Sequence, residues 1–245
     1  MRPLKITCWL NSPIAGDPPR LDALLEWVMS AKMRAVLESS NGDRHTTGMP
    51  KHRGQPVVPG AIPIPLARVR VDGYPHTIPL CSDPIMADTS NDGVEYFTRR
   101  FPSEMSGLLA PTERKTVTVD SGANKSYRLP LRIRLVDRIV WFCCGRDKID
   151  TGRSAGTETR KLLRKVYSIG KKTSDGYGQV SRWDVELTDD DFSWFAPSHD
   201  GPVLMRTLPA STKFPDRLQG FKRSYGAPVA PYWMAENYTE LLMPC

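Results

Sequence analysis

Apolar and polar residues alternate near the start of the chain. Leu4, Ile6 and Cys8 fall on one face of an extended segment, whereas Lys5 and Thr7 fall on the other. This period of two residues predicts a half-buried strand over 4–10. The next periodic segment follows a loop rich in proline and glycine.

Leucines then recur at helical spacing. Leu21, Leu24, Leu25 and Val28 are three or four residues apart, so one side of a helix would carry them all. The spacing predicts a helix over 21–38 whose apolar side faces the core.

The rest of the chain contains further strand patterns and one more helical pattern. Strands are expected over 62–71, 74–80, 128–135, 138–144 and 180–187, with a short one around 116–119, and a basic helix is expected over 157–168. The order strand, helix, strands, helix, strand is typical of a ferredoxin-like, or RRM-like, α+β domain. We therefore expect residues 1–245 to form a single domain with long loops, an insertion at about 83–125 and an irregular extension at about 210–245.

The composition narrows the class of protein only a little. Lys and Arg number 34 against 27 Asp and Glu, which gives a net charge of +7. A moderate excess of positive charge fits a polyanionic partner without identifying one. The 22 prolines and 18 glycines argue for long connections and against a helical bundle.

Cysteine spacing and hydropathy indicate a cytoplasmic protein. The five cysteines contain no Cys-x-x-Cys pair and no Cys/His group with zinc-ligand spacing, and such a set is typical of reduced thiols. The longest apolar run, 139–144, is far shorter than the ~20 residues of a membrane span, and the N-terminus does not resemble a signal peptide. We expect no metal, no cofactor and no membrane contact.

The segment 168–180, Ser-Ile-Gly-Lys-Lys-Thr-Ser-Asp-Gly-Tyr-Gly-Gln-Val, contains residue types that bind phosphate. Gly170, Gly176 and Gly178 permit positive φ and close backbone approach, so successive N–H groups can point at one oxyanion. The segment also offers charges on Lys171 and Lys172 and hydroxyl donors on Thr173 and Ser174 that could contact phosphate. The Tyr177 ring could stack on a base.

Basic residues elsewhere extend the candidate surface, and together with the loop they suit single-stranded nucleic acid. They are Arg132 and Arg134 on a predicted strand, Arg146 and Arg153 before the second helix, and Lys51, His52 and Arg53 in a loop.

The glycine-rich segment has two other interpretations. A Walker A loop would need a glycine five residues before Gly170, where the chain has Lys165. The segment could also be a simple turn between helix and strand with solvated lysines, and spacing alone does not decide between that turn and a phosphate site.

The run Ile-Gly-Lys-Lys-x-x-x-Gly-Tyr-Gly-x-Val between a helix and a strand resembles the glycine-rich loop of the RAMP superfamily, the RNA-binding subunits of CRISPR effector complexes. Other segments are similar to the type IV member that plays the "Cas five" role. They are Ser12-Pro13, Leu21-Asp22-Ala23-Leu24-Leu25, Ile64-Pro65-Leu66-Ala67-Arg68, Arg182-Trp183-Asp184-Val185-Glu186 and Leu204-Met205-Arg206-Thr207-Leu208-Pro209. They extend from the N-terminus to about residue 209, and residues 39–60, 83–125 and 210–245 carry no match.

This resemblance implies a function and a set of partners. Such subunits adopt a RAMP fold and bind the five-prime handle of a CRISPR RNA. They also cap a filament of backbone subunits and contact the large subunit, and they do not catalyse a reaction. Target DNA is a further candidate partner. By position, Gly170, Lys171, Lys172 and the Gly176-Tyr177-Gly178 run would contact RNA.

Two enzymatic alternatives stay open at this point. The first is a metal-independent endoribonuclease within the same superfamily, with His45 or His52 as general base. The second is a serine hydrolase, since Ser154 lies in a Gly-x-Ser-x-Gly pattern with Asp184 and His199 downstream. The charged residues 147–151 precede that pattern, where a nucleophile elbow would need a buried strand.

Three tryptophans lie on predicted strands. Trp141 is expected in the core, because apolar residues surround it, whereas Trp9 and Trp183 have polar neighbours and could stack bases.

Overall fold

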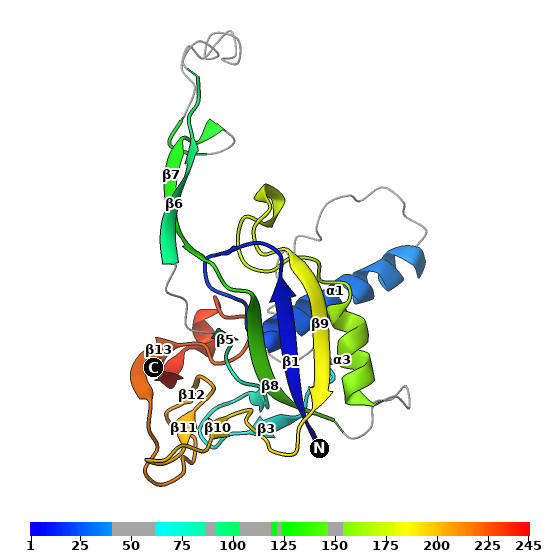
Figure 1. Ribbon diagram of the computed structural model, residues 1–245, viewed down its shortest axis with the longest axis vertical. Helices are drawn as coiled ribbons and strands as arrows, with labels where there is room; N and C mark the ends of the chain where they lie inside the picture. Colours follow the sequence, from blue (N-terminus) through cyan, green and yellow to red (C-terminus); the bar gives the residue numbers. More distant parts are fainter. Residues whose placement is uncertain (41–61, 87–91, 103–118, 122–123, 147–153) are drawn as a thin grey trace.

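The computed structural model describes residues 1–40, 62–86, 92–102, 119–121, 124–146 and 154–245 (Figure 1). The described residues form a mixed α+β architecture with mostly antiparallel strands and two α-helices, and the sequence predicted this α+β class. Part of the strand expected at 116–119 lies outside these residues.

The largest sheet has four strands in the order β5-β8-β1-β9. They are β1 (Arg2–Leu10), β5 (Ile85–Met86), β8 (Arg138–Gly145) and β9 (Val180–Leu187), and every neighbouring pair is antiparallel. Three of these strands, β1, β8 and β9, lie where the sequence predicted strands, and β9 covers the predicted 180–187. The fourth, β5, falls in the region expected to be an insertion.

Helices α1 (Leu21–Ser40) and α3 (Ala155–Leu163) pack on one face of this sheet. Figure 1 shows α1 passing behind β1 and β9, with α3 beside it. The apolar positions of β1, such as Ile6, face this core and stand opposite Trp141 of β8 and Val185 of β9. Alternation therefore selected the buried face correctly.

The second helix is shorter than the periodicity predicted. Ser154 caps its N-terminus by accepting a hydrogen bond from the Thr157 N–H at 3.3 Å, and the helix ends at Leu163 rather than near residue 168. Val166 and Ile169 continue the apolar pattern and are buried, but they lie in the non-helical segment that follows.

A two-stranded arm projects from the body of the molecule (Figure 1). It consists of β6 (Asp92–Arg99) and β7 (Tyr127–Arg134), paired along their full length, and β2 (Ile14–Ala15) joins the base of β7. The strand expected at 128–135 is therefore present, but it belongs to the arm and not to the main sheet. Most arm residues are exposed.

Several short strands lie outside the main sheet, and the sequence pattern missed those that follow residue 190. A first hairpin joins β3 (Arg68–Arg70) to β4 (Thr77–Pro79), close to where two longer strands were expected. Strands β10 (Phe195–Ala196) and β11 (Val203–Leu204) form a two-stranded sheet. A three-stranded sheet has the order β12-β14-β13 and consists of β12 (Leu208–Pro209), β13 (Phe221–Gly226) and β14 (Thr239–Pro244). A 3-10 turn at Ala235–Asn237 precedes β14. The description of 210–245 as irregular is thus wrong.

These short strands surround a second apolar core that includes Ile78, Leu208 and Val229. Strands of two or three residues, some containing proline, are too short to show alternation, so burial contributed by distant segments decides their conformation.

A buried ion pair joins helix α1 to this second core. Arg206 Nη2 lies 2.7 Å from Asp22 Oδ2, and the two side chains are 0% and 1% exposed. Tyr232 donates a hydrogen bond to the same carboxylate at 2.9 Å. Burial alone would raise the pKa of Asp22, but the charge and hydrogen bonds of Arg206 hold that pKa below its usual value.

Candidate nucleic-acid interface

The glycine-rich segment 168–180 is fastened to residues 12–16, which follow β1. The Lys171 N–H donates to the Ala15 carbonyl and the Gly178 N–H donates to the Pro13 carbonyl, both at 2.8 Å. The Gln179 N–H donates to Ser12 Oγ at 2.9 Å. Two parts of the chain that are far apart in sequence, including the Ser12-Pro13 pair, therefore fix one loop at the end of the main sheet.

Two of the three glycines are required by close contacts. Gly178 has φ +63°, and a Cβ on it would lie 1.8 Å from the Ile169 carbonyl oxygen. Gly170 has φ +88°, and a Cβ there would lie 2.7 Å from Ile14 Cγ1. Both positions accept only glycine, because the backbone is left-handed and the space is filled.

The backbone donors of this loop divide into two groups. The N–H groups of residues 169, 171 and 175–180 are hydrogen-bonded within the protein. Those of Gly170, Lys172, Thr173 and Ser174 have no partner among the described residues. Lys172 has φ +56°, and the 3-10 turn Thr173–Asp175 begins directly after it. The donors available to an anion are thus at the loop's tip rather than along its whole length.

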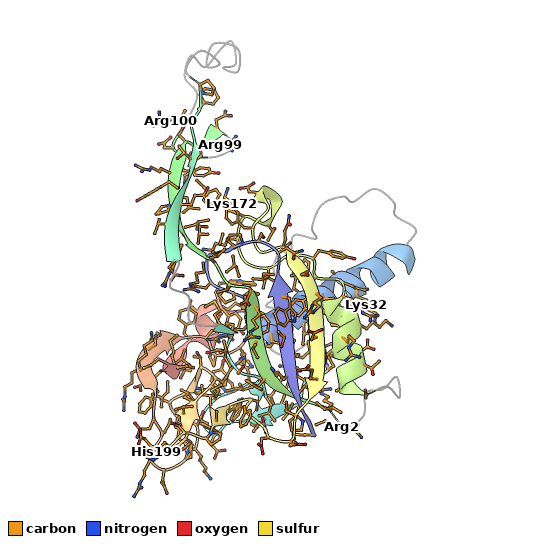
Figure 2. The ribbon with its side chains drawn as sticks, viewed as in Figure 1. Arg2, Lys32, Arg99, Arg100, Lys172 and His199 are labelled. Atoms are coloured by element: carbon orange, nitrogen blue, oxygen red, sulfur yellow. The ribbon has the colours of Figure 1, made fainter. Side chains whose placement is uncertain are left out.

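The two lysines differ in how far their charges are compensated. Lys172 Nζ lies 4.6 Å from the centre of the Phe97 ring and 3.3 Å from Asp175 Oδ2. Lys171 is exposed and has no ion-pair partner within the described part of the chain. Figure 2 shows Lys172 between the arm and the end of the sheet. Lys171 is therefore the freer cation of the pair.

Tyr177 connects the loop to the arm. Its hydroxyl donates a hydrogen bond to Glu95, and its ring meets Phe97 edge-on with centroids 5.7 Å apart. The hydrogen bond to the Glu95 carboxylate raises the pKa of Tyr177 above its ordinary value. Since the ring is only partly covered, part of it remains accessible for stacking.

The arm carries two of the predicted arginines, in unequal environments. The Arg134 side chain is 11% exposed and pairs with Asp17 at 3.0 Å and Asp92 at 3.9 Å. Arg132 also pairs with Asp92, but its side chain is 58% exposed. Arg132 can therefore reach a ligand, while the carboxylates around Arg134 hold it in a structural position.

Arg146 lies away from the glycine-rich loop. It follows Gly145, which pairs with Arg2 at the far end of the sheet, and its Nε donates to the Leu66 carbonyl at 3.0 Å. Figure 2 places Arg2 at the end opposite Lys172. The structure does not bring Arg146 together with the loop.

The remaining predicted contacts, Lys51, His52, Arg53 and Arg153, lie outside the described residues, as does His45.

A groove beside the loop was not anticipated from the sequence. It has a volume of about 320 Å³ and lies between α1 and the loop, where Trp27, Gly170 and Thr173 contribute to its lining. Trp27 is 55% exposed, and the groove is also lined by Gly170 and Thr173, whose N–H groups have no partner among the described residues. The sequence does offer one indication of this groove, because Trp27 falls on the polar side of the helix predicted over 21–38.

The arm adds a second aromatic feature that sequence reasoning missed. The Arg128 guanidinium lies 4.0 Å from the centre of the Tyr96 ring, on the face of the arm that carries Arg132. Because β6 was not expected as a strand, nothing in the sequence placed Tyr96 opposite β7.

Ser154 and its proposed hydrolase partners are not assembled into a triad. The Ser154 hydroxyl caps α3 and lies 2.9 Å from Thr157 Oγ1. His199 pairs with Asp200, and Asp184 accepts a hydrogen bond from Trp9 on the main sheet. These contacts give Ser154 a capping role in the structure.

Within the described ranges, no group of three or more His, Cys, Asp or Glu side chains is placed to hold a metal ion. Likewise, no helix in those ranges is long and apolar enough to cross a membrane. No protein-family model matches the chain, and no curated protein matches it.

Proposed function

We propose that this chain is a non-catalytic RNA-binding subunit that grips the five-prime handle of a CRISPR RNA in a type IV effector complex. The observation that carries the proposal is the glycine-rich loop, whose tip presents unpartnered N–H groups beside the exposed Lys171. Its sequence resembles the glycine-rich loop of RAMP subunits, and the further segments named above resemble the type IV member in the same order along the chain.

The order of the main sheet supports a ferredoxin-like RAMP fold. Along the chain, the four strands and two helices follow each other as strand, helix, strand, strand, helix, strand. Their spatial order β9-β1-β8-β5 places the first and third of these strands in the centre. This is the arrangement expected when each helix crosses back over the same face of an antiparallel sheet.

The chemistry around the loop suits a single strand. A phosphate oxygen would accept hydrogen bonds from the tip N–H groups and pair with Lys171. An unpaired base would stack on Trp27, which is half exposed in the neighbouring groove. Tyr177, held by Glu95 and Phe97, offers a second ring nearby.

The proposed role is binding and assembly. The subunit would cap a filament of backbone RAMP subunits and contact the large subunit, and target DNA is a further candidate ligand. The capping contact of Ser154 supports a role without hydrolase chemistry.

Co-purification followed by binding tests this proposal. Tagged protein expressed with its complex is expected to retain a discrete RNA whose five-prime end derives from a CRISPR repeat. That RNA, transcribed and labelled, is then titrated with purified protein in a filter-binding assay. Absence of a repeat-derived RNA would overturn the proposal, and a discrete cleavage product formed in EDTA would overturn its non-catalytic part.

The double variant Lys171→Glu, Lys172→Glu assigns binding to the loop. We expect it to bind the RNA about ten- to a hundredfold more weakly, because hydrogen bonds to charged groups contribute about 1.5–3 kcal/mol. The matched control is Lys213→Glu with Lys222→Glu, two exposed lysines of the C-terminal segment, which should retain most of the affinity. Equal affinities for the two variants would contradict the loop assignment.

A further inference from the structure

The face of the main sheet opposite the helices carries an arginine–tryptophan triad, consisting of Trp9, Arg138 and Arg182. In the strand register Trp9 stands directly opposite Arg138 of β8 on one side and Arg182 of β9 on the other. The two guanidinium carbons lie 5.5 and 4.5 Å from the centre of the Trp9 ring. Three neighbouring strands thus contribute one side chain each to a single cluster.

The triad is held in place before any ligand arrives. The Trp9 indole N–H donates to Asp184 Oδ2 at 2.6 Å, and Arg182 Nε lies 3.2 Å from the same oxygen. The hydrogen bond from Trp9 lowers the pKa of Asp184, and so does Arg182. A fixed indole ring reduces the freedom that each stacked arginine would lose on binding.

The charge of the triad is only partly compensated. Arg182 shares the Asp184 carboxylate, and its side chain is 61% exposed. The Arg138 side chain is exposed and has neither a hydrogen-bond nor an ion-pair partner in the part of the chain that the structure describes. Guanidinium groups that stack on a ring keep their N–H edges free, and those edges match a phosphate.

The rest of this face is less open. Phe142 packs edge-on against Phe192 of the C-terminal part, with centroids 5.3 Å apart, and Lys5 pairs with Glu186 at 3.7 Å. The triad occupies the other end, next to the glycine-rich loop. Leu10 and Val180 pair directly beyond it, and the Asn11 N–H donates to the Gln179 carbonyl at 2.9 Å. The loop and the triad are therefore continuous in the structure.

We propose that the arginine–tryptophan triad is a second phosphate-binding site, which takes the backbone of the same RNA strand where it leaves the glycine-rich loop. Arg138 and Arg182 contact phosphate oxygens, and Trp9 is a positioning residue that holds both guanidinium groups. Its ring is covered by those groups, so it does not serve as a platform for bases. This inference rests on the proposed function, since the strand must first be bound by the loop.

The salt dependence of binding tests the triad. The probe is a labelled single-stranded RNA of mixed sequence and about 30 nucleotides, longer than the ~4–16 nucleotides that one small single-strand-binding fold covers. Its affinity for the full chain is measured by fluorescence anisotropy between about 50 and 200 mM salt. Each phosphate contact on a single strand contributes about 0.7 to the slope of log K against log salt.

The variant Arg138→Gln, Arg182→Gln is expected to bind about tenfold more weakly, with a slope less steep by about 1.4. The charge-matched control, Lys213→Gln with Lys222→Gln, should keep the slope of the wild type. Trp9→Leu should lose the same part of the slope, and Trp9→Phe should largely restore it because a ring again supports the arginines. A thermal melt confirms that each variant is folded.

The outcomes separate this inference from the proposed function. If the arginine variant keeps the wild-type slope while Lys171→Glu with Lys172→Glu still weakens binding, the triad is not a phosphate site and the loop assignment stands. If the salt slope becomes less steep in the arginine variant but stays at the wild-type value in Trp9→Leu, the positioning role of Trp9 is wrong. If the wild-type protein binds neither this RNA nor the repeat-derived RNA, both proposals fail.

Discussion

The buried pair between Asp22 and Arg206 provides the sharpest test of how the two cores are joined. Replacing Arg206 with methionine leaves the Asp22 carboxylate, which is 1% exposed, without its guanidinium partner. The Tyr232 hydroxyl and the nearby charge of Arg20 remain. Removal of one partner of a buried ion pair is strongly destabilising, so we expect the free energy of unfolding at pH 7 to fall by about 3–5 kcal/mol.

The pH dependence of that loss has a definite sign. In the wild type the pKa of Asp22 is lowered by Arg206, so its stabilising contribution is present above the unfolded pKa of about 3.9 and is lost as pH falls through the folded pKa. In Arg206→Met, burial dominates and raises this pKa. The native variant then holds the proton more tightly than the unfolded chain, and its stability falls as pH rises above about 4.

Urea denaturation, followed by tryptophan fluorescence at several pH values between about 4 and 7, measures both effects. The difference in unfolding free energy between wild type and variant should widen as pH rises. The control is Arg223→Met, which removes an exposed pair with Glu240 and should cost less than about 1 kcal/mol. A constant difference, or a loss at pH 7 no larger than that of the control, would refute the reasoning.

Two further predictions concern the loop and helix α1. Gly178→Ala should lower the free energy of unfolding by about 2 kcal/mol or more, because φ is +63° and the Cβ would lie 1.8 Å from the Ile169 carbonyl oxygen. The control is Gly93→Ala, whose Cβ would meet nothing within 4 Å and which should leave the melting temperature nearly unchanged. Equal losses of stability in the two variants would contradict this account of the loop. Burial raises the pKa of Glu26 from 4.5 to about 7 despite its ion pair with Arg68. Its contribution to stability is therefore present below about pH 4.5 and lost as pH rises through 7. Glu26→Gln should remove that decline, so the melting temperature of the variant should rise relative to the wild type between these pH values, and parallel melting curves would exclude the assignment.

Local patterns determined the elements that are long and half-buried. Alternation located β1, the sequence also predicted β9, and the leucine spacing located the start of α1 at Leu21. The glycine-rich loop was also visible locally, because Gly170 and Gly178 are needed for a backbone that other residues disfavour. These features depend on a few neighbouring residues, so one sequence was enough to find them.

The arm and the C-terminal sheets were not visible in this way. β6 alternates poorly and is exposed on both faces, and its pairing with β7 joins residues about thirty-five positions apart. β10, β11 and β12 have two residues each, which is too short for any period. Their conformation comes from contacts with distant segments.

The residues of the candidate site show the same difference between what local sequence predicts and what the tertiary structure decides. The sequence by itself identified the glycine-rich loop, the pair Lys171 and Lys172, and the arginines as a class of ligand-binding residues. The sequence named Arg134 as a candidate and did not name Arg138. Only the tertiary structure showed that two carboxylates neutralise Arg134 and that the Arg138 guanidinium lies against the Trp9 ring. The physical reason is that charge and propensity belong to single residues, whereas burial, pairing and shared faces exist only after distant segments have come together.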